Sequence, residues 1–315
     1  MSEASGLPPS ADVRRHVVRL SGDQLLKTAR LVAEAVDADM VTASIFLAIS
    51  RANTVEIARE SHRTAAYSAL EDIPPDDLRI PVSVYAVARE MSVPYETARR
   101  HVAKLCKAGL CAKTGDGLVI PREIYLRPAL LKATVQNWRQ ALEFLADLAA
   151  VGVEASNPSP PREGVDVRRQ ILRLTTNMFL EAVEILMARI GLDLIHTLLY
   201  ITVIQANVRH ISEDPDVAAN YSGLRDIPPD DERRPVSVYA VAREMGLPYE
   251  TARRHIRQMT DAGLLARDRN GGVWAPAALH SQADWVAGAE VSWGQVKRLV
   301  EAFGQLGVTA KTPLV

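Results

Sequence analysis

The chain has 315 residues, enough for about two domains of ordinary size. Hydrophobic residues make up 48% of it and charged residues 24%, which is typical of a globular protein with a buried core and excludes a disordered chain. The formal net charge of −1 excludes a basic field over the whole molecule, so any nucleic-acid-binding charge has to be local. The two cysteines, Cys106 and Cys111, are too few for a disulfide framework and indicate a reducing compartment.

Residues 1–12 contain no apolar segment of signal-peptide length, and we expect them to be disordered. The longest apolar run, residues 190–206, includes Asp193 and His196. It is too short and too polar for a membrane span and predicts a buried helix. We therefore expect a cytoplasmic protein without a membrane partner.

One unit of about 150 residues occurs twice in the chain. The stretch PVSVYAVAREMSVPYETARRH at 81–101 returns as PVSVYAVAREMGLPYETARRH at 235–255, and only two of the 21 positions differ. The same offset of 154 residues aligns VRRHVVRL at 13–20 with VRRQILRL at 167–174. Similarity at one fixed offset indicates an internal duplication.

A segment rich in Pro, Ser and Gly, EASNPSPPREG at 154–164, separates the two copies. This composition is typical of a linker. It divides the chain into a first unit at 13–153 and a second unit at 165–309, which leaves a tail at 310–315.

Each unit begins with helices and ends with one. Apolar residues at helical spacing predict helices within 23–36 and 178–208, and closing helices at 130–151 and 283–306. The acidic DIPPDD connector precedes the duplicated stretch in both copies, and its prolines predict a capped, extended segment.

Asn53 and Asn207 occupy matched positions in otherwise apolar helices. They could pair across an interface and fix its register, as buried polar groups can. The helices around them are either plain core or a pairing surface between units or chains. A small-molecule pocket among these helices is a further alternative, although the sequence singles out no residues for it.

The duplicated stretch begins with a short helix. Ser83 and Ser237 are its expected N-caps, and Tyr85, Ala88 and Met91 form its expected apolar face. The sequences SVP and GLP then break the helix.

A second helix follows this break. Pro94 and Pro248 suit its first position, and Gly109 and Gly263 its C-terminal end. The residues after it predict two short strands around a turn, with a strong hairpin signal at Asn270-Gly271.

Helix, tight turn, helix and two-stranded hairpin is the order of a winged helix-turn-helix. The pattern VYAVAREMGLPYETARRHIRQMTDAGLLARD resembles the DNA-binding domains of IclR-type and MarR-type bacterial transcription regulators, over about forty residues of each copy. The resemblance implies a mainly α fold of two tandem winged helix-turn-helix units, each with flanking helices and a small β-hairpin wing. It also implies that the second helix of each motif lies in the major groove of DNA.

The side chains opposite the apolar face of this second helix, with basic residues of the wing, are the candidate DNA contacts. Arginine reads guanine, glutamate can accept from the cytosine amino group, and wing residues can reach the backbone. Residues 83–120 carry six basic and three acidic side chains, and 237–274 carry six and four. The candidates are Tyr95, Glu96, Thr97, Arg99, Arg100, Lys104 and Lys113 in the first copy and Tyr249, Glu250, Thr251, Arg253, Arg254, Arg257, Arg267 and Arg269 in the second.

Other interpretations stay open for these residues. The arginines could form a solvated helix face, and the motif could bind protein instead of DNA. His101 and His255 could pack against their units or donate to a phosphate. No cluster of His, Cys, Asp and Glu has metal-ligand spacing, so we expect no metal site and no cofactor. Cys106 and Cys111 are expected to be packing residues, with a redox switch as the alternative.

These observations predict a sequence-specific DNA-binding transcription regulator that is not an enzyme. Duplication would make it a covalent pseudo-dimer that reads two similar half-sites of double-stranded DNA within the nucleoid. The order of the half-sites, inverted or direct, stays open. RNA polymerase or another regulator is a candidate further partner, as is a second copy of the chain. The alternative function is a winged-helix scaffold for protein partners.

Overall fold

A computed structural model describes residues 12–162 and 164–313 of the chain. Residues 1–11 of the expected disordered N-terminus therefore lie outside the described residues, as do residues 314–315 of the tail. Asp12, the last residue of that N-terminal segment, is bound: its carboxylate accepts hydrogen bonds from the backbone amides of Arg14 and Leu224.

The protein is mainly helical, with two small antiparallel sheets. The helices of the described residues are α1 (Arg14–Ala35), α2 (Met40–Asn53), α3 (Val55–Arg59), α4 (Ser61–Ala66), α5 (Val84–Glu90), α6 (Tyr95–Lys107), α7 (Arg122–Tyr125), α8 (Pro128–Ala150), α9 (Arg168–Ile190), α10 (Leu194–Glu213), α11 (Pro215–Asn220), α12 (Val238–Met245), α13 (Tyr249–Asp261), α14 (Ala277–His280) and α15 (Ala283–Gln305). The strands are β1 (Ala112–Lys113), β2 (Leu118–Val119), β3 (Val236–Ser237), β4 (Ala266–Arg267) and β5 (Gly272–Trp274). None of the helices in the described ranges is long and apolar enough to cross a membrane.

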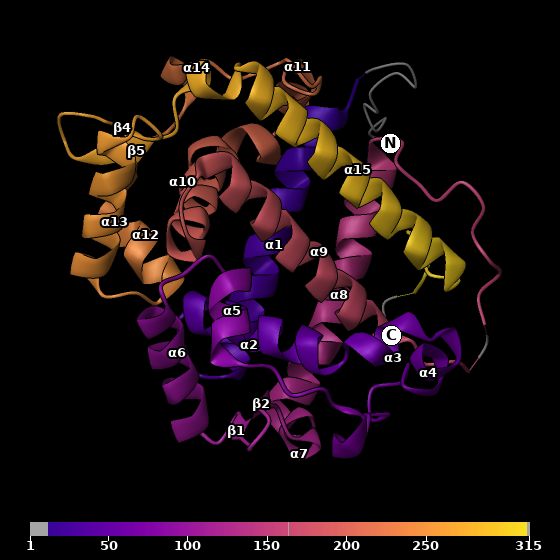
Figure 1. Cartoon of the computed structure of the whole chain (residues 1–315). Coiled ribbons are helices and arrows are strands. Elements are labelled where there is room, and N and C mark those ends of the chain that lie inside the picture. Colours follow the sequence, from indigo (N-terminus) through magenta and orange to yellow (C-terminus); the bar gives the residue numbers. More distant parts are fainter. Residues whose placement is uncertain (1–11, 163, 314–315) are drawn as a thin grey trace.

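The long helices of both copies form the middle of the molecule, and the duplicated stretches lie at one side (Figure 1). Helix α1 packs against α8, α15, α2 and α10, while α9 packs against α15, α8, α10 and α2. One hydrophobic cluster therefore contains buried residues of both copies, from Val17 in α1 to Phe303 in α15. The two copies share a core, and the first helix of each copy packs on helices of both.

Two reciprocal contacts, here called the clasps, join the copies. In one, the backbone amide of Arg15 donates to the carbonyl of Ser222 at 2.9 Å. In the other, the amide of Arg169 donates to the carbonyl of Ser68 at 3.0 Å. With the offset of 154, Arg15 corresponds to Arg169 and Ser68 to Ser222. Each copy thus donates through its arginine and accepts through its serine, so the contact is isologous, as in a twofold dimer.

Asn53 and Asn207 do not pair with each other, contrary to the interface hypothesis. The side chain of Asn53 donates to the carbonyls of Ile80 and Leu118 and accepts from the amide of Ile120. Asn207 makes the matching three bonds in the second copy. Each asparagine is fully buried and ties its helix to the strand region of its own copy, where it satisfies backbone groups that would otherwise be orphaned.

The first helix of the duplicated stretch has the predicted N-caps: Ser83 accepts from the amide of Ala86, and Ser237 from that of Ala240. Its predicted apolar face is confirmed at Ala88 and Met91, which are buried, and is wrong at Tyr85, which is 67% exposed. Val87, expected at the flank of that face, is fully buried.

The second helix starts one residue later than predicted. Pro94 and Pro248 have extended ψ values of 141° and 135° and stand at the N-cap, before Tyr95 and Tyr249. The helix ends as predicted, with Gly109 and Gly263 at positive φ.

The hairpins β1–β2 and β4–β5 form where the sequence predicts them. A third strand, β3, also pairs with β5, and in the first copy Val82 forms the corresponding single bridge with Leu118.

The DIPPDD connectors are capped but not fully extended, since each ends in a 3-10 turn, at Asp76–Leu78 and Asp230–Glu232. Asp76 accepts from the amide of Arg122 at the start of α7, and Asp230 accepts from the amide of Ala277 at the start of α14.

Candidate nucleic-acid interface

Helices α6 and α13 lie on the same side of the molecule (Figure 1). Helix α6 packs on α5 and α2 through Ala98, Val102 and Leu105, and α13 packs on α12 and α10 through the matched face. An N-capping aspartate positions each supporting helix: Asp39 accepts from the amide of Thr42 in α2, and Asp193 from that of His196 in α10. The opposite faces of α6 and α13 are therefore left to solvent.

The structure brings the candidate DNA-binding residues of each copy onto this outer face and the neighbouring hairpin. Thr97 and Thr251 are half-buried, and all the others are exposed. The exposed ones are Tyr95, Glu96, Arg99, Arg100, Lys104 and Lys113 in the first copy and Tyr249, Glu250, Arg253, Arg254, Arg257, Arg267 and Arg269 in the second.

Some of these cations are paired. Glu96 binds Arg99 at 2.9 Å, and Glu250 binds Arg253 at 2.7 Å, one turn along the same helix. The hydrogen bond with Glu250 raises the pKa of Arg253. Exposed i,i+3 pairs of this kind contribute little stability because water screens them, so a competing anion can open them.

Arg100 and Arg254, the second arginines of the motif, form no ion pair with any described residue. The guanidinium of Arg254 stands 3.5 Å from Nε2 of His255. Lys104 binds Asp39 at 3.0 Å, whereas Gln258 occupies its position in the second copy. The arrangement leaves one matched arginine of each helix ready to bind an anion.

Two tyrosines per copy extend the exposed face. Tyr85 and Tyr239 in the first helices are 67% and 65% exposed, and Tyr95 and Tyr249 are 50% and 45% exposed. Sequence reasoning missed Tyr85 and Tyr239, because it assigned them to the apolar face. The signal that could have found them is the residue type, since tyrosine combines an apolar ring with a polar hydroxyl and is common at interfaces.

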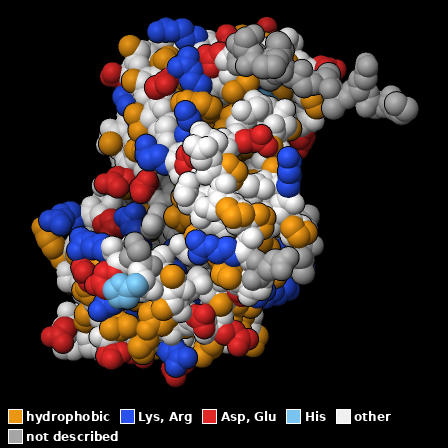
Figure 2. Space-filling view, turned by 90° about the vertical axis from the view of Figure 1, so that its right-hand side faces the viewer, with side chains coloured by type: hydrophobic (Ala, Val, Ile, Leu, Met, Phe, Trp, Pro, Cys, Tyr) orange, Lys and Arg blue, Asp and Glu red, His pale blue; other side chains and the backbone are white. Residues whose placement is uncertain are grey.

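The opposite side of the molecule differs in charge pattern. In Figure 2 acidic and basic side chains alternate over this face, and neither sign gathers over one element. The six basic residues counted in each duplicated stretch lie in α5, α6 and the β1–β2 hairpin of the first copy and in α12, α13 and the β4–β5 hairpin of the second.

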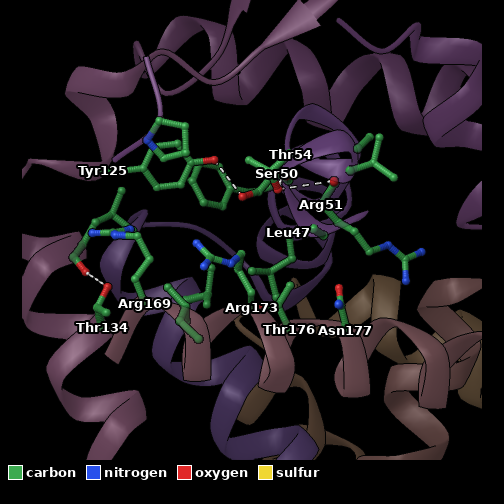
Figure 3. A pocket seen from close by; sticks show the side chains of 18 of the residues that line it. Leu47, Ser50, Arg51, Thr54, Tyr125, Thr134, Arg169, Arg173, Thr176 and Asn177 are labelled. Carbon is green, nitrogen blue, oxygen red and sulfur yellow. Dashed lines mark hydrogen bonds between the residues drawn. The ribbon is translucent and has the colours of Figure 1, made fainter. Parts of the chain in front are cut away.

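A cavity of about 580 Å³ lies between the copies (Figure 3). Helices α1, α2 and α8 of the first copy and α9 of the second form its walls. Tyr125 donates to or accepts from Ser50 at 2.7 Å on one wall, and Arg169 and Arg173 enter from α9. Burial lowers the pKa of both guanidinium groups to about 10, so both stay charged at neutral pH.

These two arginines donate to the backbone carbonyls of Leu70 and Tyr67. Neither arginine forms an ion pair with a described carboxylate, although Glu90, which pairs with Arg51, and Glu181 also line the cavity. The cavity therefore combines an apolar wall with two arginines held by backbone carbonyls. It suits a small molecule with an apolar body and an anionic end. The sequence had allowed a small-molecule pocket as an alternative but had assigned no residues to it.

The matched cavity of the second copy has only about 160 Å³. Trp285 stands where the first copy has Leu130, and its ring packs at 5.3 Å against both Tyr200 and His280. Ile204 replaces Ser50 as well. Larger apolar side chains therefore fill the second cavity, and the two copies are not equivalent there.

His101 and His255 lie on the buried faces of α6 and α13, so the interpretation that they pack against their units is confirmed. Burial lowers the pKa of each to about 4. His101 is 2.7 Å from the hydroxyl of Thr42. In the second copy His196 takes the place of Thr42.

His255, His196 and Asp193 form a cluster whose ligand atoms all lie within 4.8 Å of one another, which corrects the expectation that no metal-ligand cluster exists. The signal in the sequence was D-x-x-H at 193–196, one turn of a helix, but its third member lies 59 residues farther along the chain.

Cys111 is buried and Cys106 is half-buried, and both are free. Burial raises the pKa of the Cys111 thiol to about 12, which keeps it protonated and unreactive, as expected of a packing residue.

Comparison of the chain with family models, with curated proteins and with solved structures gave no match.

Proposed function

We propose that the protein is a sequence-specific DNA-binding transcription regulator with two winged helix-turn-helix units. In this proposal α6 and α13 are the recognition helices that enter the major groove, and the hairpins β1–β2 and β4–β5 are the wings. Arg100 and Arg254 are the primary base-reading residues, because they are exposed and unpaired among the described residues.

One observation carries the proposal. The same sequence, Tyr-Glu-Thr-Ala-Arg-Arg, with its Tyr, Glu and both Arg exposed, is present on two helices at one side of the molecule. Stability alone requires no such agreement, because exposed side chains tolerate substitution with little loss of free energy. A ligand that presents the same anionic surface to both helices requires the same side chains on each, and double-stranded DNA is such a ligand.

The reciprocal clasps support a particular operator. Units related by a twofold axis present their recognition helices to half-sites in inverted order, whereas units in head-to-tail order read a direct repeat. The clasp of Arg15 with Ser222 and that of Arg169 with Ser68 are of the isologous kind. We therefore expect one chain to bind an imperfect inverted repeat.

The test is binding of the full chain to DNA fragments enriched from a random pool, followed by fluorescence anisotropy at fixed salt. Replacing Arg100 and Arg254 together by Ala should weaken binding by about 1–3 kcal/mol per lost guanine contact. Arg99→Ala with Arg253→Ala should weaken it less, because Glu96 and Glu250 already hold those guanidinium groups.

Arg298→Ala is the control, because this exposed arginine lies on α15, away from both recognition helices. It should leave affinity unchanged. Equal affinity of the wild type and the Arg100/Arg254 variant, with both folded by circular dichroism, would reject the proposal. Failure to enrich any DNA sequence would favour the alternative, a scaffold that binds protein partners through the same two faces.

A further inference from the structure

The two copies differ where α6 and α13 meet their supporting helices, α2 and α10. The first copy places Asp39, Thr42, His101 and Lys104 there, and the second places Asp193, His196, His255 and Gln258 at the four matched positions. Asp and one His are shared. The exchanges of Thr for His and of Lys for Gln add an imidazole and remove an ammonium group from the second copy.

Three atoms that can bind a metal ion converge in the second copy. Nε2 of His196 is 3.0 Å from Nδ1 of His255 and 3.0 Å from Oε1 of Gln258. Both imidazoles are buried, whereas Gln258 is exposed, so the cluster opens toward solvent on that side.

Asp193 determines which nitrogen of His196 is free. Its Oδ1 is 2.6 Å from Nδ1 of His196, and a carboxylate at that distance requires the proton to be on Nδ1. The lone pair of Nε2 then faces His255. A carboxylate that orients the distal nitrogen of a histidine in this way is the usual support of a metal-binding imidazole.

The geometry points to a binding site for one divalent transition-metal ion of the class that prefers imidazole, such as Zn²⁺ or Co²⁺. Nε2 of His196 and Nδ1 of His255 are the nitrogen ligands, Asp193 orients His196, and the amide oxygen of Gln258 and water complete the coordination. The separation of 3.0 Å between the two nitrogens is close to the edge of a tetrahedron with Zn–N bonds of about 2.0–2.1 Å, which is about 3.3 Å.

The first copy cannot hold such an ion. Thr42 provides a hydroxyl in place of the second imidazole, and the ammonium group of Lys104 binds Asp39 at 3.0 Å. A cation is already present where the metal would bind. The site is therefore specific to the second copy, where it connects α10 with α13. It lies next to the first copy, because the amide of Leu194 at the start of α10 donates to the carbonyl of Met91 at the end of α5.

The test uses the full chain after treatment with a chelator. Titration with Co²⁺, followed by d–d absorption, and with Zn²⁺, followed by calorimetry, should show one equivalent bound. His196→Thr gives the second copy the residue of the first and should abolish binding. Thr42→Ala changes the matched position of the first copy and should leave one equivalent.

A second variant keeps the test decisive if His196→Thr fails to fold. Gln258→Lys alters an exposed position and introduces the ammonium group that the first copy has, so it should weaken binding at least tenfold. A wild-type chain that binds neither ion would overturn the assignment, and so would a folded His196→Thr or Gln258→Lys chain that binds as the wild type does. Because the readout is metal binding without DNA, failure here does not affect the proposed function.

Discussion

Ser92 and Gly246 occupy the same place in the turn between the two helices of the duplicated stretch, but only one of them suits its conformation. Both have positive φ, 49° for Ser92 and 66° for Gly246. A β-carbon is disfavoured in this region, whereas glycine adopts it readily. The turn of the second copy also packs closely, since a β-carbon at Gly246 would lie 3.4 Å from the Cα of Asp39.

We expect Ser92→Gly to raise the free energy of unfolding by about 1 kcal/mol, because it removes left-handed strain from a non-glycine residue. Urea unfolding measures the change. Gly246→Ser is the reverse exchange at the matched position and should lower the free energy of unfolding by a similar amount. A destabilised Ser92→Gly chain would show that the serine side chain contributes more than its strain costs.

His280 is a buried base beside two arginines. Burial, and then the charges of Arg233 and Arg15, lower its pKa to about 3, and Tyr200 is 2.9 Å from its Nε2. Its folded-state pKa is below the usual 6.5, so the unfolded chain takes up a proton first as the pH falls. The resulting loss of stability begins near pH 6.5 and continues toward pH 3.

His280→Gln keeps a hydrogen-bond acceptor for Tyr200 but does not titrate. Between pH 7 and pH 5 the wild type should lose about 2 kcal/mol more unfolding free energy than this variant, as expected for one proton taken up only by the unfolded chain. Urea unfolding at both pH values provides the comparison. Equal losses in the two chains would mean that His280 is protonated in the folded state.

At the scale of elements, α6 and α13 each bury four side chains and leave most of the others exposed. Each is supported by a central helix whose N-cap aspartate also reaches toward the exposed helix: Asp39 binds Lys104, and Asp193 binds His196 next to His255. The contacts between each supporting helix and its exposed helix therefore differ between the copies.

The cavity between α2, α8 and α9 differs from its counterpart mainly through Leu130 and Trp285. We expect Leu130→Trp to fill the larger cavity, as Trp285 fills the smaller one. An anilinonaphthalene sulfonate dye, which has an apolar body and an anionic end, should bind the folded wild type. The substitution should abolish that fluorescence signal.

Arg139→Ala, an exposed change elsewhere on α8, is the control and should leave dye binding as it is. If Leu130→Trp bound the dye with unchanged affinity while folded, the dye site would lie outside this cavity.

At the scale of the molecule, the clasps and the shared core hold the two copies together without the linker. The linker itself lies against the end of α15, where Ser159 donates to the carbonyl of Gly304 and Ser156 to the carboxylate of Glu301. Helix α1 packs on α15 and α10 of the second copy, and α9 packs on α8 and α2 of the first, within one shared hydrophobic core.

We expect a chain cut at an engineered protease site near Pro160 to elute from a sizing column as one species at micromolar concentration. The reason is that Arg15 and Arg169 also donate from their side chains to the carbonyls of Leu224 and Leu70, contacts that do not involve the linker. The uncut chain carrying the same protease site is the control. Separation into two halves would mean that the interface is weaker than its burial suggests.

The duplication, the mainly helical content, the N-caps at Ser83 and Ser237 and the hairpins after Gly109 and Gly263 were all determined by the sequence itself. These features depend on residues a few positions apart, through spacing, capping and turn preference. A match of 19 in 21 positions also makes the two local structures alike without reference to the rest of the chain.

The tertiary structure alone decided what those elements contact. Asn53 bonds to a strand region 67 residues away instead of to Asn207, and Tyr85 is exposed whereas Val87 of the same helix is buried. The clasps, the unequal cavities and the cluster of His196 with His255 each join residues that are 59 or more positions apart. Packing of distant segments creates such sites, and local periodicity carries no information about which segments meet.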